Sequence, residues 1–320
     1  MTVFNITLDC AVAPASTPSD AGVAGAGILL AFIITAALAL LLSGYIILSE
    51  LRSSTSSHAI SRKLLSGLSD QQIVEGISIQ AIGLVRINSM VPYHFFIIWM
   101  LSLLSTATNF AALLALVKDY KRDWVLRWLR QAAMFVNLSL TVVFGVFVLE
   151  VNMKNLSDTL PIGCVWDADH AKTEENAGSN HALSVAGTIA VISASAIVFV
   201  LGTWYLHLRK QLWGRFVRVL SLALLFAIAV AAAVRVVLIS QAFGTPSVRL
   251  ADQGETEWSF GQLLAMVLLV LPFVSALEIY RGELQVPICE SQVEPDQMPL
   301  TGVNDGGKKR YTYQSNPWFK

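Results

Sequence analysis

The sequence has few charged residues for its length, and this is the first constraint on the kind of protein it encodes. Only 14% of the 320 residues are Asp, Glu, Lys or Arg, whereas soluble domains carry roughly 25%. Hydrophobic residues make up 55% of the chain, and the mean hydropathy is +0.61. The formal net charge is zero, and no basic stripe with interleaved aromatics occurs, which argues against a nucleic-acid partner. The composition predicts an integral membrane protein, with the lipid bilayer as its first partner.

The chain also lacks the residues on which several function classes depend. No lysine lies in a long apolar run, which excludes a retinal Schiff base of the microbial rhodopsin kind. The five histidines have no paired helical spacing for a metal, and we expect neither a metal nor a cofactor. No Gly-x-Ser-x-Gly elbow, P-loop, dinucleotide fingerprint or Asp-rich diphosphate motif is present. The seventh apolar run lacks an Asn-Pro-x-x-Tyr motif, so the chain is similar to G-protein-coupled receptors only in its predicted topology.

Seven apolar runs are long enough to cross a bilayer, which takes about 20 residues in a helix. They cover residues 22–48, 71–90, 93–117, 132–150, 183–206, 217–240 and 259–279. The second run is the weakest because it contains Glu75, Arg86 and two glycines. Pro272 should kink the seventh. We therefore predict an all-α, seven-helix polytopic membrane protein.

The distribution of basic residues predicts the orientation of this bundle. If the N-terminus is outside or luminal, 17 of the 22 Lys and Arg residues fall on the cytosolic side. The chain then divides into a short outer segment (1–21), a transmembrane domain (22–281) and a flexible cytosolic tail (282–320). We expect the endoplasmic reticulum rather than the plasma membrane, because lipid-soluble intermediates accumulate there.

Two features of the outer side concern covalent modification. Cys10 and Cys164 both face the oxidising compartment in this topology, where a disulfide would tie the N-terminus to the long outer loop 151–182. Two free thiols are the alternative. The sequons at Asn5 and Asn155 are candidate glycosylation sites on the same side, whereas the sequon at Asn137 lies inside a span.

Span two carries charges that are costly in a bilayer and usually functional. Ser69 and Gln72 fit a capping box and predict that the helix begins there. Glu75 then lies near the inner end of the span, where it either reaches the interface or is buried and neutral, as a proton donor must be. Arg86 lies near the outer end.

Polar residues of several spans share the depth of Arg86. Glu150 ends span four there, Arg235 is in the outer third of span six, and Tyr93 and His94 open span three. If these spans adjoin, the residues form a polar pocket beneath the outer loops. The alternative is that each side chain reaches the headgroups separately. Further candidate lining residues are Trp99, Asn109, Asn137 and Trp258, although hydrogen bonds between helices explain the two asparagines better than substrate contact does.

Three short motifs give the chain a family likeness. They are Asp20-Ala21-Gly22, the LSDQQ sequence of residues 68–72, and Tyr93-His94-Phe95. With these motifs the chain resembles a group of multi-pass membrane proteins of filamentous ascomycete fungi, most clearly over residues 20–130. That group often has a Thr-His pair deep in span three, where this chain has Thr108-Asn109, so a proton-transfer role of that histidine does not carry over. In architecture alone, the chain is also similar to the membrane-bound meroterpenoid cyclases of fungi.

Two functions are compatible with these residues. The first is a cyclase that protonates an epoxide or alkene of a prenylated, lipid-soluble metabolite, with Glu75 or Glu150 as the acid. Arg86, His94 and Arg235 would complete that site. An arginine beside Glu150 would lower the pKa of this carboxyl and favour a structural ion pair, in which case the arginines could polarise a substrate oxygen or Glu75 could act alone. The second function is a seven-transmembrane receptor or sensor without enzymatic activity. The sequence identifies no protein partner.

Overall fold

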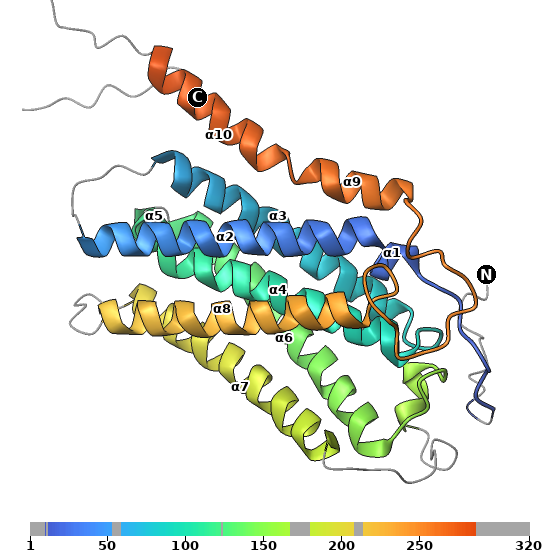
Figure 1. Ribbon diagram of the computed structural model, residues 1–320. Helices are drawn as coiled ribbons and strands as arrows, with labels where there is room; N and C mark the ends of the chain where they lie inside the picture. The colour runs from blue at the N-terminus through green and yellow to red at the C-terminus, as the bar shows by residue number, and fades with distance from the viewer. Residues whose placement is uncertain are drawn as a thin grey trace, which may run out of the picture. The chain divides into compact units, whose positions relative to one another are not determined.

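The computed structural model describes residues 10, 12–52, 59–122, 124–166, 180–207 and 214–285, and these ranges are almost entirely helical (Figure 1). Within them there is no strand, and a single bridge pairs Thr17 with Leu250. The elements in chain order are α1 (Ala21–Ala24), α2 (Ala26–Arg52), α3 (Ala59–Val85), α4 (Pro92–Ala115), α5 (Val117–Arg122), α6 (Trp124–Lys154), the 3-10 helix η1 (Ile162–Trp166), α7 (Asn180–His207), α8 (Gly214–Ile239), α9 (Phe260–Leu268) and α10 (Leu271–Gln285).

Six helical segments are long and apolar enough to cross a membrane. They are Ala21–Arg52, Pro92–Ala115, Arg127–Lys154, Ser184–Trp204, Phe216–Ile239 and Phe260–Glu278. The chain is therefore a helical protein of the multi-pass membrane type. Helix α3 corresponds to the second predicted span. With 27 residues it is long enough to cross a bilayer. It is less hydrophobic than the other six segments because it contains the charged residues Arg62, Lys63, Asp70 and Glu75.

The predicted start of α3 is wrong. The helix begins at Ala59, ten residues before the expected cap, and Ser69 is buried in its interior, where its hydroxyl donates to Asn109 Oδ1. Leu65 and Leu68 are fully buried, so the preceding turns are stabilised by packing. In proteins such burial outweighs a local capping pattern, because tertiary packing supplies most of the stability of a helix.

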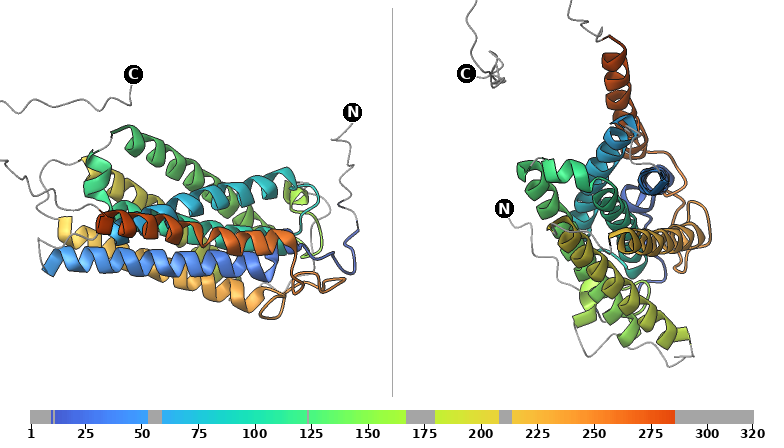
Figure 2. Two further views of the ribbon diagram at one scale, coloured as in Figure 1. Left: turned by 90° about the horizontal axis from the view of Figure 1, so that it is seen from above. Right: turned by 90° about the vertical axis from the view of Figure 1, so that its left-hand side faces the viewer.

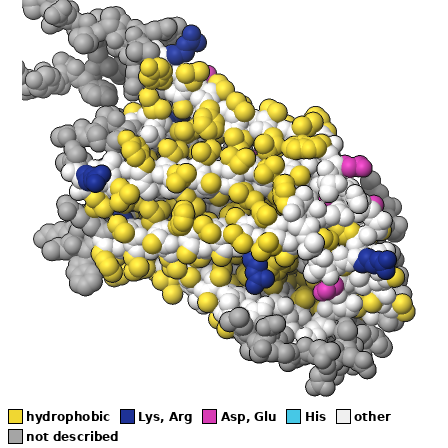
Figure 3. Space-filling view, viewed as in Figure 1, with side chains coloured by type: hydrophobic (Ala, Val, Ile, Leu, Met, Phe, Trp, Pro, Cys, Tyr) yellow, Lys and Arg dark blue, Asp and Glu magenta, His cyan; other side chains and the backbone are white. Residues whose placement is uncertain are grey.

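The core of the bundle is organised around α4. All of its side chains except that of Phe96 are buried, and it packs against α2, α3, α6, α7 and α8, which surround it in the end-on view of Figure 2. The outer helices turn hydrophobic side chains outward, so that the face drawn in Figure 3 is largely apolar. A helix bundle with an apolar exterior has lipid as its natural solvent.

The seventh predicted span is broken where the sequence suggested. Helix α9 ends at Leu268 and α10 begins at Leu271, which makes Pro272 the second residue of the new helix. Proline is tolerated in the first turn because the N–H groups there have no intrahelical partner. Residues 1–281 form one compact unit, whereas most of the predicted tail, residues 286–320, lies outside the described ranges.

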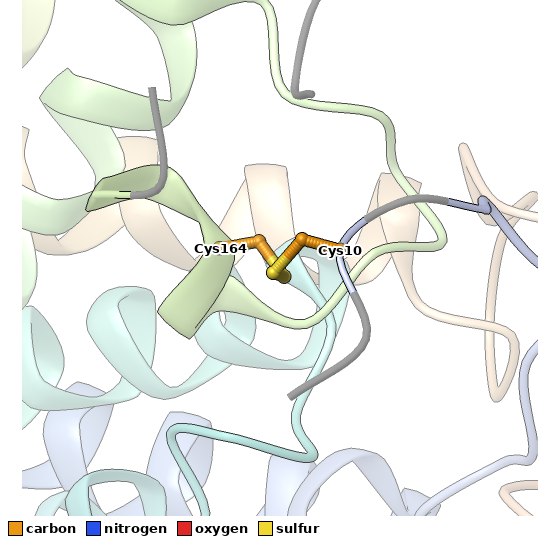
Figure 4. Close-up of a disulfide and its surroundings, with 2 residues drawn as sticks. All are labelled: Cys10 and Cys164. Atoms are coloured by element: carbon orange, nitrogen blue, oxygen red, sulfur yellow. A yellow bond between two sulfur atoms is a disulfide. The ribbon is translucent and has the colours of Figure 1, made fainter. Parts of the chain in front are cut away.

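The two ends of the bundle differ, and we name each by its chemistry. At the disulfide end, Cys10 is bonded to Cys164 of η1, which is the pairing considered from the sequence (Figure 4). At the opposite end, the Glu50 end, α2 finishes with a carboxylate that receives cations from three other helices.

Candidate functional site

A cavity of about 720 Å³ lies between α4, α6, α7 and α8 in the half of the bundle next to the disulfide end. Aromatic and aliphatic side chains form most of its wall, chiefly Phe96, Trp99, Met100, Leu103, Val148, Val151, Val191 and Ile228. The polar members are few and come from different elements: Tyr93, Asn152, Asp158, Ser184, Thr188, Arg235 and Ser247. A mostly apolar cavity with a small number of polar groups is the usual form of a small-molecule site.

Three of the residues predicted from the sequence meet in this cavity. Tyr93 and Trp99 lie on the first turns of α4, and Arg235 lies one turn before the end of α8. Trp99 is only 3% exposed, and its indole Nε1–H has no hydrogen-bond partner in the part of the chain that the structure describes. The guanidinium of Arg235 makes no ion pair with any described carboxylate.

Asp158 also lines the cavity, and sequence reasoning did not select it. It lies in the connection between α6 and η1, outside the spanning helices. Its side chain is exposed at the cavity edge, yet the protein around it desolvates the carboxylate in part and raises its pKa above the ordinary value for aspartate. The sequence showed only that Asp158 is one acidic residue of an acidic loop.

A buried cluster around Glu255 lies behind the cavity wall. Tyr93 Oη donates to Glu255 Oε2 at 2.8 Å, and His94 Nε2 lies 2.7 Å from Glu255 Oε1. The backbone N–H of Gln241 donates to Tyr93 Oη at 3.0 Å, and the N–H of Ala26 donates to the Glu255 carbonyl oxygen at 3.2 Å. Glu255 is 0% exposed. The cluster therefore fixes the 240–259 loop onto α4 and α2, and it places His94 in this structural contact rather than in the cavity.

Arg86 and Glu150 do not join the predicted pocket. Arg86 lies just past the end of α3, and its Nη1 is 2.5 Å from Asp20 Oδ2 in the N-terminal segment. Glu150 pairs with Lys154 one turn further along α6, at 3.4 Å. Neither residue lines the cavity. Arg86 and Glu150 therefore do not group with Arg235 as the sequence predicted. Each pairs instead with a charged residue close by, Asp20 for Arg86 and Lys154 for Glu150.

Glu75 lies in a separate groove of about 390 Å³, between α3 and the break of the seventh span. Its Oε1 accepts a hydrogen bond from Gln71 Nε2 at 2.8 Å. The other oxygen, Oε2, is buried and has no partner among the described residues. Leu268, Leu271 and Pro272 form the apolar side of the groove. Glu75 is thus a partly buried carboxyl, remote from the residues of the cavity.

The two asparagines serve as links between helices. Asn137 Nδ2 donates to Thr106 Oγ1 at 3.0 Å, and its Oδ1 accepts from Gln80 Nε2 at 2.9 Å. Asn109 accepts from Ser69 and lies within α4, also away from the cavity. These bonds join α3, α4 and α6 in the bundle interior, as the preferred interpretation of the sequence predicted.

The remaining predicted residues lie outside the cavity. Trp258 is 55% exposed and flanks Gly27, where an added Cβ would stand 3.0 Å from the indole ring. Asn155 is exposed in the turn after α6, with a φ of 50°, and Asn5 lies outside the described residues. In the described ranges, no group of His, Cys, Asp and Glu side chains could hold a metal ion.

Comparison of the chain with protein-family models, with curated proteins and with solved structures found no match.

Proposed function

We propose that the protein crosses the membrane seven times, with α3 as the additional span and the disulfide end outside or in the lumen. The Cys10–Cys164 bond supports this orientation because structural disulfides persist in oxidising compartments. The excess of Lys and Arg at the opposite end agrees with the positive-inside rule. The endoplasmic reticulum membrane is the location we propose.

The cavity next to the disulfide end is the site we propose for a lipid-soluble small molecule. Its volume of about 720 Å³ and its apolar wall are the observations that carry this proposal. A volume between about 300 and 1,000 Å³ is typical of sites for drug-sized ligands. The exposed apolar faces of α7 and α8 border the cavity, which would let such a molecule enter from the bilayer.

The reaction we propose is the acid-initiated cyclisation of a prenylated epoxide. A carboxylic acid transfers its proton to the epoxide oxygen, one C–O bond of the epoxide breaks, and an alkene of the substrate attacks the resulting cation to form a ring. Loss of a proton to a base then gives a product isomeric with the substrate, and no soluble co-reactant is consumed. The rings of Phe96, Trp99 and Tyr93 would stabilise the cation.

Asp158 is the best-placed acid for this reaction in the cavity. Its raised pKa increases the fraction of the protonated form at a given pH. Glu150 is less suitable because Lys154 stabilises its charged form. Glu75 remains the alternative acid if the substrate binds in the groove beside Pro272, where one carboxyl oxygen has no partner in the described chain.

Microsomes containing the protein test this proposal. Given a farnesyl-arene epoxide and no soluble cofactor, they should form a cyclised product of unchanged mass, detected by chromatography with mass spectrometry. Asp158→Asn should lower the initial rate at least tenfold, whereas Glu257→Gln, an exposed carboxylate outside the cavity, should not. The wild-type rate should fall as pH rises through the raised pKa of Asp158, because the protonated acid is then lost. If Glu75→Gln is inactive and Asp158→Asn active, the acid is in the groove.

A receptor is the second candidate, and the Glu50 end favours it. Arg62, Lys118 and Arg218 come from α3, α5 and α8 and all contact Glu50, so a relative movement of these helices would change several ion pairs at once. A receptor should bind an intracellular partner in a ligand-dependent manner, and truncation before Glu283 should abolish that binding. Cyclisation without any such partner would decide against this candidate.

A further inference from the structure

We propose that the cavity recognises an oxyanion: its ligand carries a carboxylate or an equivalent group, which Arg235 and the indole N–H of Trp99 bind. This inference rests on the proposed use of the cavity as the ligand site. It adds the chemical class of the ligand, an amphiphile with an apolar body and one anionic oxygen group.

Arg235 is the first observation. Its side chain lines the cavity near the end of α8, is exposed at the surface of the bundle, and has no ion-pair partner in the described ranges. A cation at membrane depth is costly unless it is paired or reaches water. Glu150 pairs with Lys154, and Asp20 pairs with Arg86. Asp158 lines the same cavity but forms no ion pair with Arg235 in the described chain. The charge of Arg235 is therefore open to a ligand.

Trp99 supplies the second, independent observation. It is 97% buried in terms of accessible surface, yet its indole N–H meets no acceptor in the described part of the chain. A buried tryptophan N–H usually has a partner, and an unsatisfied buried donor costs stability. Helix α6 passes close to this atom at Gly145, whose added Cβ would lie 3.2 Å from Nε1, and no side chain of α6 at that position supplies an acceptor. An acceptor oxygen on a ligand would satisfy this donor.

The apolar side chains of the cavity wall determine the chemistry of the rest of the ligand. Phe96, Met100 and Leu103 on α4 face Val148 on α6 and Ile228 on α8 across the cavity. These side chains offer no hydrogen bonds, so the part of the ligand that contacts them should be hydrocarbon. Two donors beside this apolar wall suit such an amphiphilic acid better than a neutral hydrocarbon.

The test uses the purified full-length protein in nanodiscs of phosphatidylcholine and a fluorescent fatty acid as the probe. Palmitic acid, methyl palmitate and hexadecanol compete for the probe at pH 8. We expect the acid to displace it at least about tenfold more strongly than the ester or the alcohol, since hydrogen bonds to charged groups are worth that much. Arg235→Gln should reduce this preference to less than about twofold, and Trp99→Phe should weaken acid binding about threefold or more.

Matched controls locate the effect. Arg249→Gln removes an exposed arginine of the same end that does not line the cavity, and Trp166→Phe removes an exposed indole; both should behave as wild type. Gly187→Leu places a side chain in open space at the cavity wall, and it should abolish binding of the probe and of all three compounds.

The outcomes separate this inference from the function on which it rests. Equal binding of acid and ester, with loss of both in Gly187→Leu, would overturn the oxyanion inference while leaving the cavity as a ligand site. A preference for the acid that survives Arg235→Gln would also overturn it. Failure of every compound and of the probe to bind would instead remove the proposed function itself. Nanodiscs that contain phosphatidic acid show whether the oxyanion belongs to a lipid headgroup or to a free acid. If this lipid competes with the probe and the competition is lost in Arg235→Gln, the oxyanion belongs to a bilayer lipid. If the lipid does not compete although palmitic acid binds, the oxyanion belongs to a free acid.

Discussion

Each end of the bundle has one carboxylate that joins several elements, and the two carboxylates do so in different ways. At the disulfide end, a single carboxylate, that of Glu255, is completely buried and bonded to Tyr93 and His94. At the Glu50 end, the side chain of Glu50 is 13% exposed and meets Arg62, Lys118 and Arg218, and Arg62 also contacts Asp119. The contacts of Glu255 are short hydrogen bonds shielded from water. The contacts of Glu50 are ion pairs that solvent reaches.

This difference bears on where the cavity lies. A covalent bond and a buried hydrogen-bond cluster hold the 240–259 loop and the N-terminal segment in place without filling the space between α6, α7 and α8. Ion pairs near the surface contribute little individually and depend on several long side chains remaining ordered. They can be exchanged as helices move. The cavity therefore lies at the end whose loops are held by a covalent bond and buried hydrogen bonds.

Glu255→Ala should have the largest effect on stability. The substitution leaves the Tyr93 hydroxyl and the His94 ring without their buried partner, and breaking such contacts costs about 3–5 kcal/mol. Thermal unfolding of the purified protein in detergent measures the loss. Glu257→Ala is the control, because this neighbouring carboxylate is exposed. Equal unfolding temperatures of the two variants would contradict the assignment of Glu255 as the anchor of this end.

Replacing both Cys10 and Cys164 by serine should have the next largest effect. The bond closes a loop of more than 150 residues, and its loss should destabilise the fold by about 2–4 kcal/mol, chiefly through the greater freedom of the unfolded chain. The unfolding temperature should fall in the variant and in reduced wild-type protein alike. Cys289→Ser should change nothing. A wild-type protein insensitive to reductant would show that the bond does not contribute to stability.

The sequence predicted the fold better than the site because the two depend on different information. Hydropathy identifies membrane-length helices from local composition, and Pro272 marks the break between α9 and α10 for a steric reason that is equally local. The start of α3 depended instead on the burial of Leu65 and Leu68 by other helices. A capping motif gives no information about that packing.

The site required knowledge of which loop residues turn inward. Tyr93, Trp99 and Arg235 could be selected because each lies within or beside a span. Glu255 and Glu257 are two residues apart in the same loop, and no sequence pattern distinguishes them. The structure buries Glu255 and exposes Glu257. The path of the loop across α2 and α4 determines which of the two carboxylates is buried, and the periodicity of the sequence does not predict that path.

Glu50→Gln should have a smaller effect than either change at the disulfide end. It removes the shared partner of three cations, but water and Asp119 can compensate in part, so we expect a loss of about 1–3 kcal/mol. The same thermal assay measures it. Asp119→Asn, which removes a half-exposed carboxylate that contacts only Arg62 among these residues, should cost less than about 1 kcal/mol. A loss for Glu50→Gln equal to that of Glu255→Ala would remove the distinction between the ends.

Salt should produce the smallest effect and distinguish the two ends most directly. Raising the ionic strength from about 0.1 M to about 1 M shortens the screening length from about 10 Å to about 3 Å. Ion pairs that reach solvent, such as Lys118 with Glu50 and Arg62 with Asp119, weaken under these conditions, so the destabilisation caused by Glu50→Gln should shrink. The destabilisation caused by Glu255→Ala should not change, because no salt ion approaches a carboxylate that is 0% exposed. Measuring both variants at the two salt concentrations therefore separates charge pairing from buried hydrogen bonding. An equal response to salt at the two ends would mean that the same kind of interaction holds both.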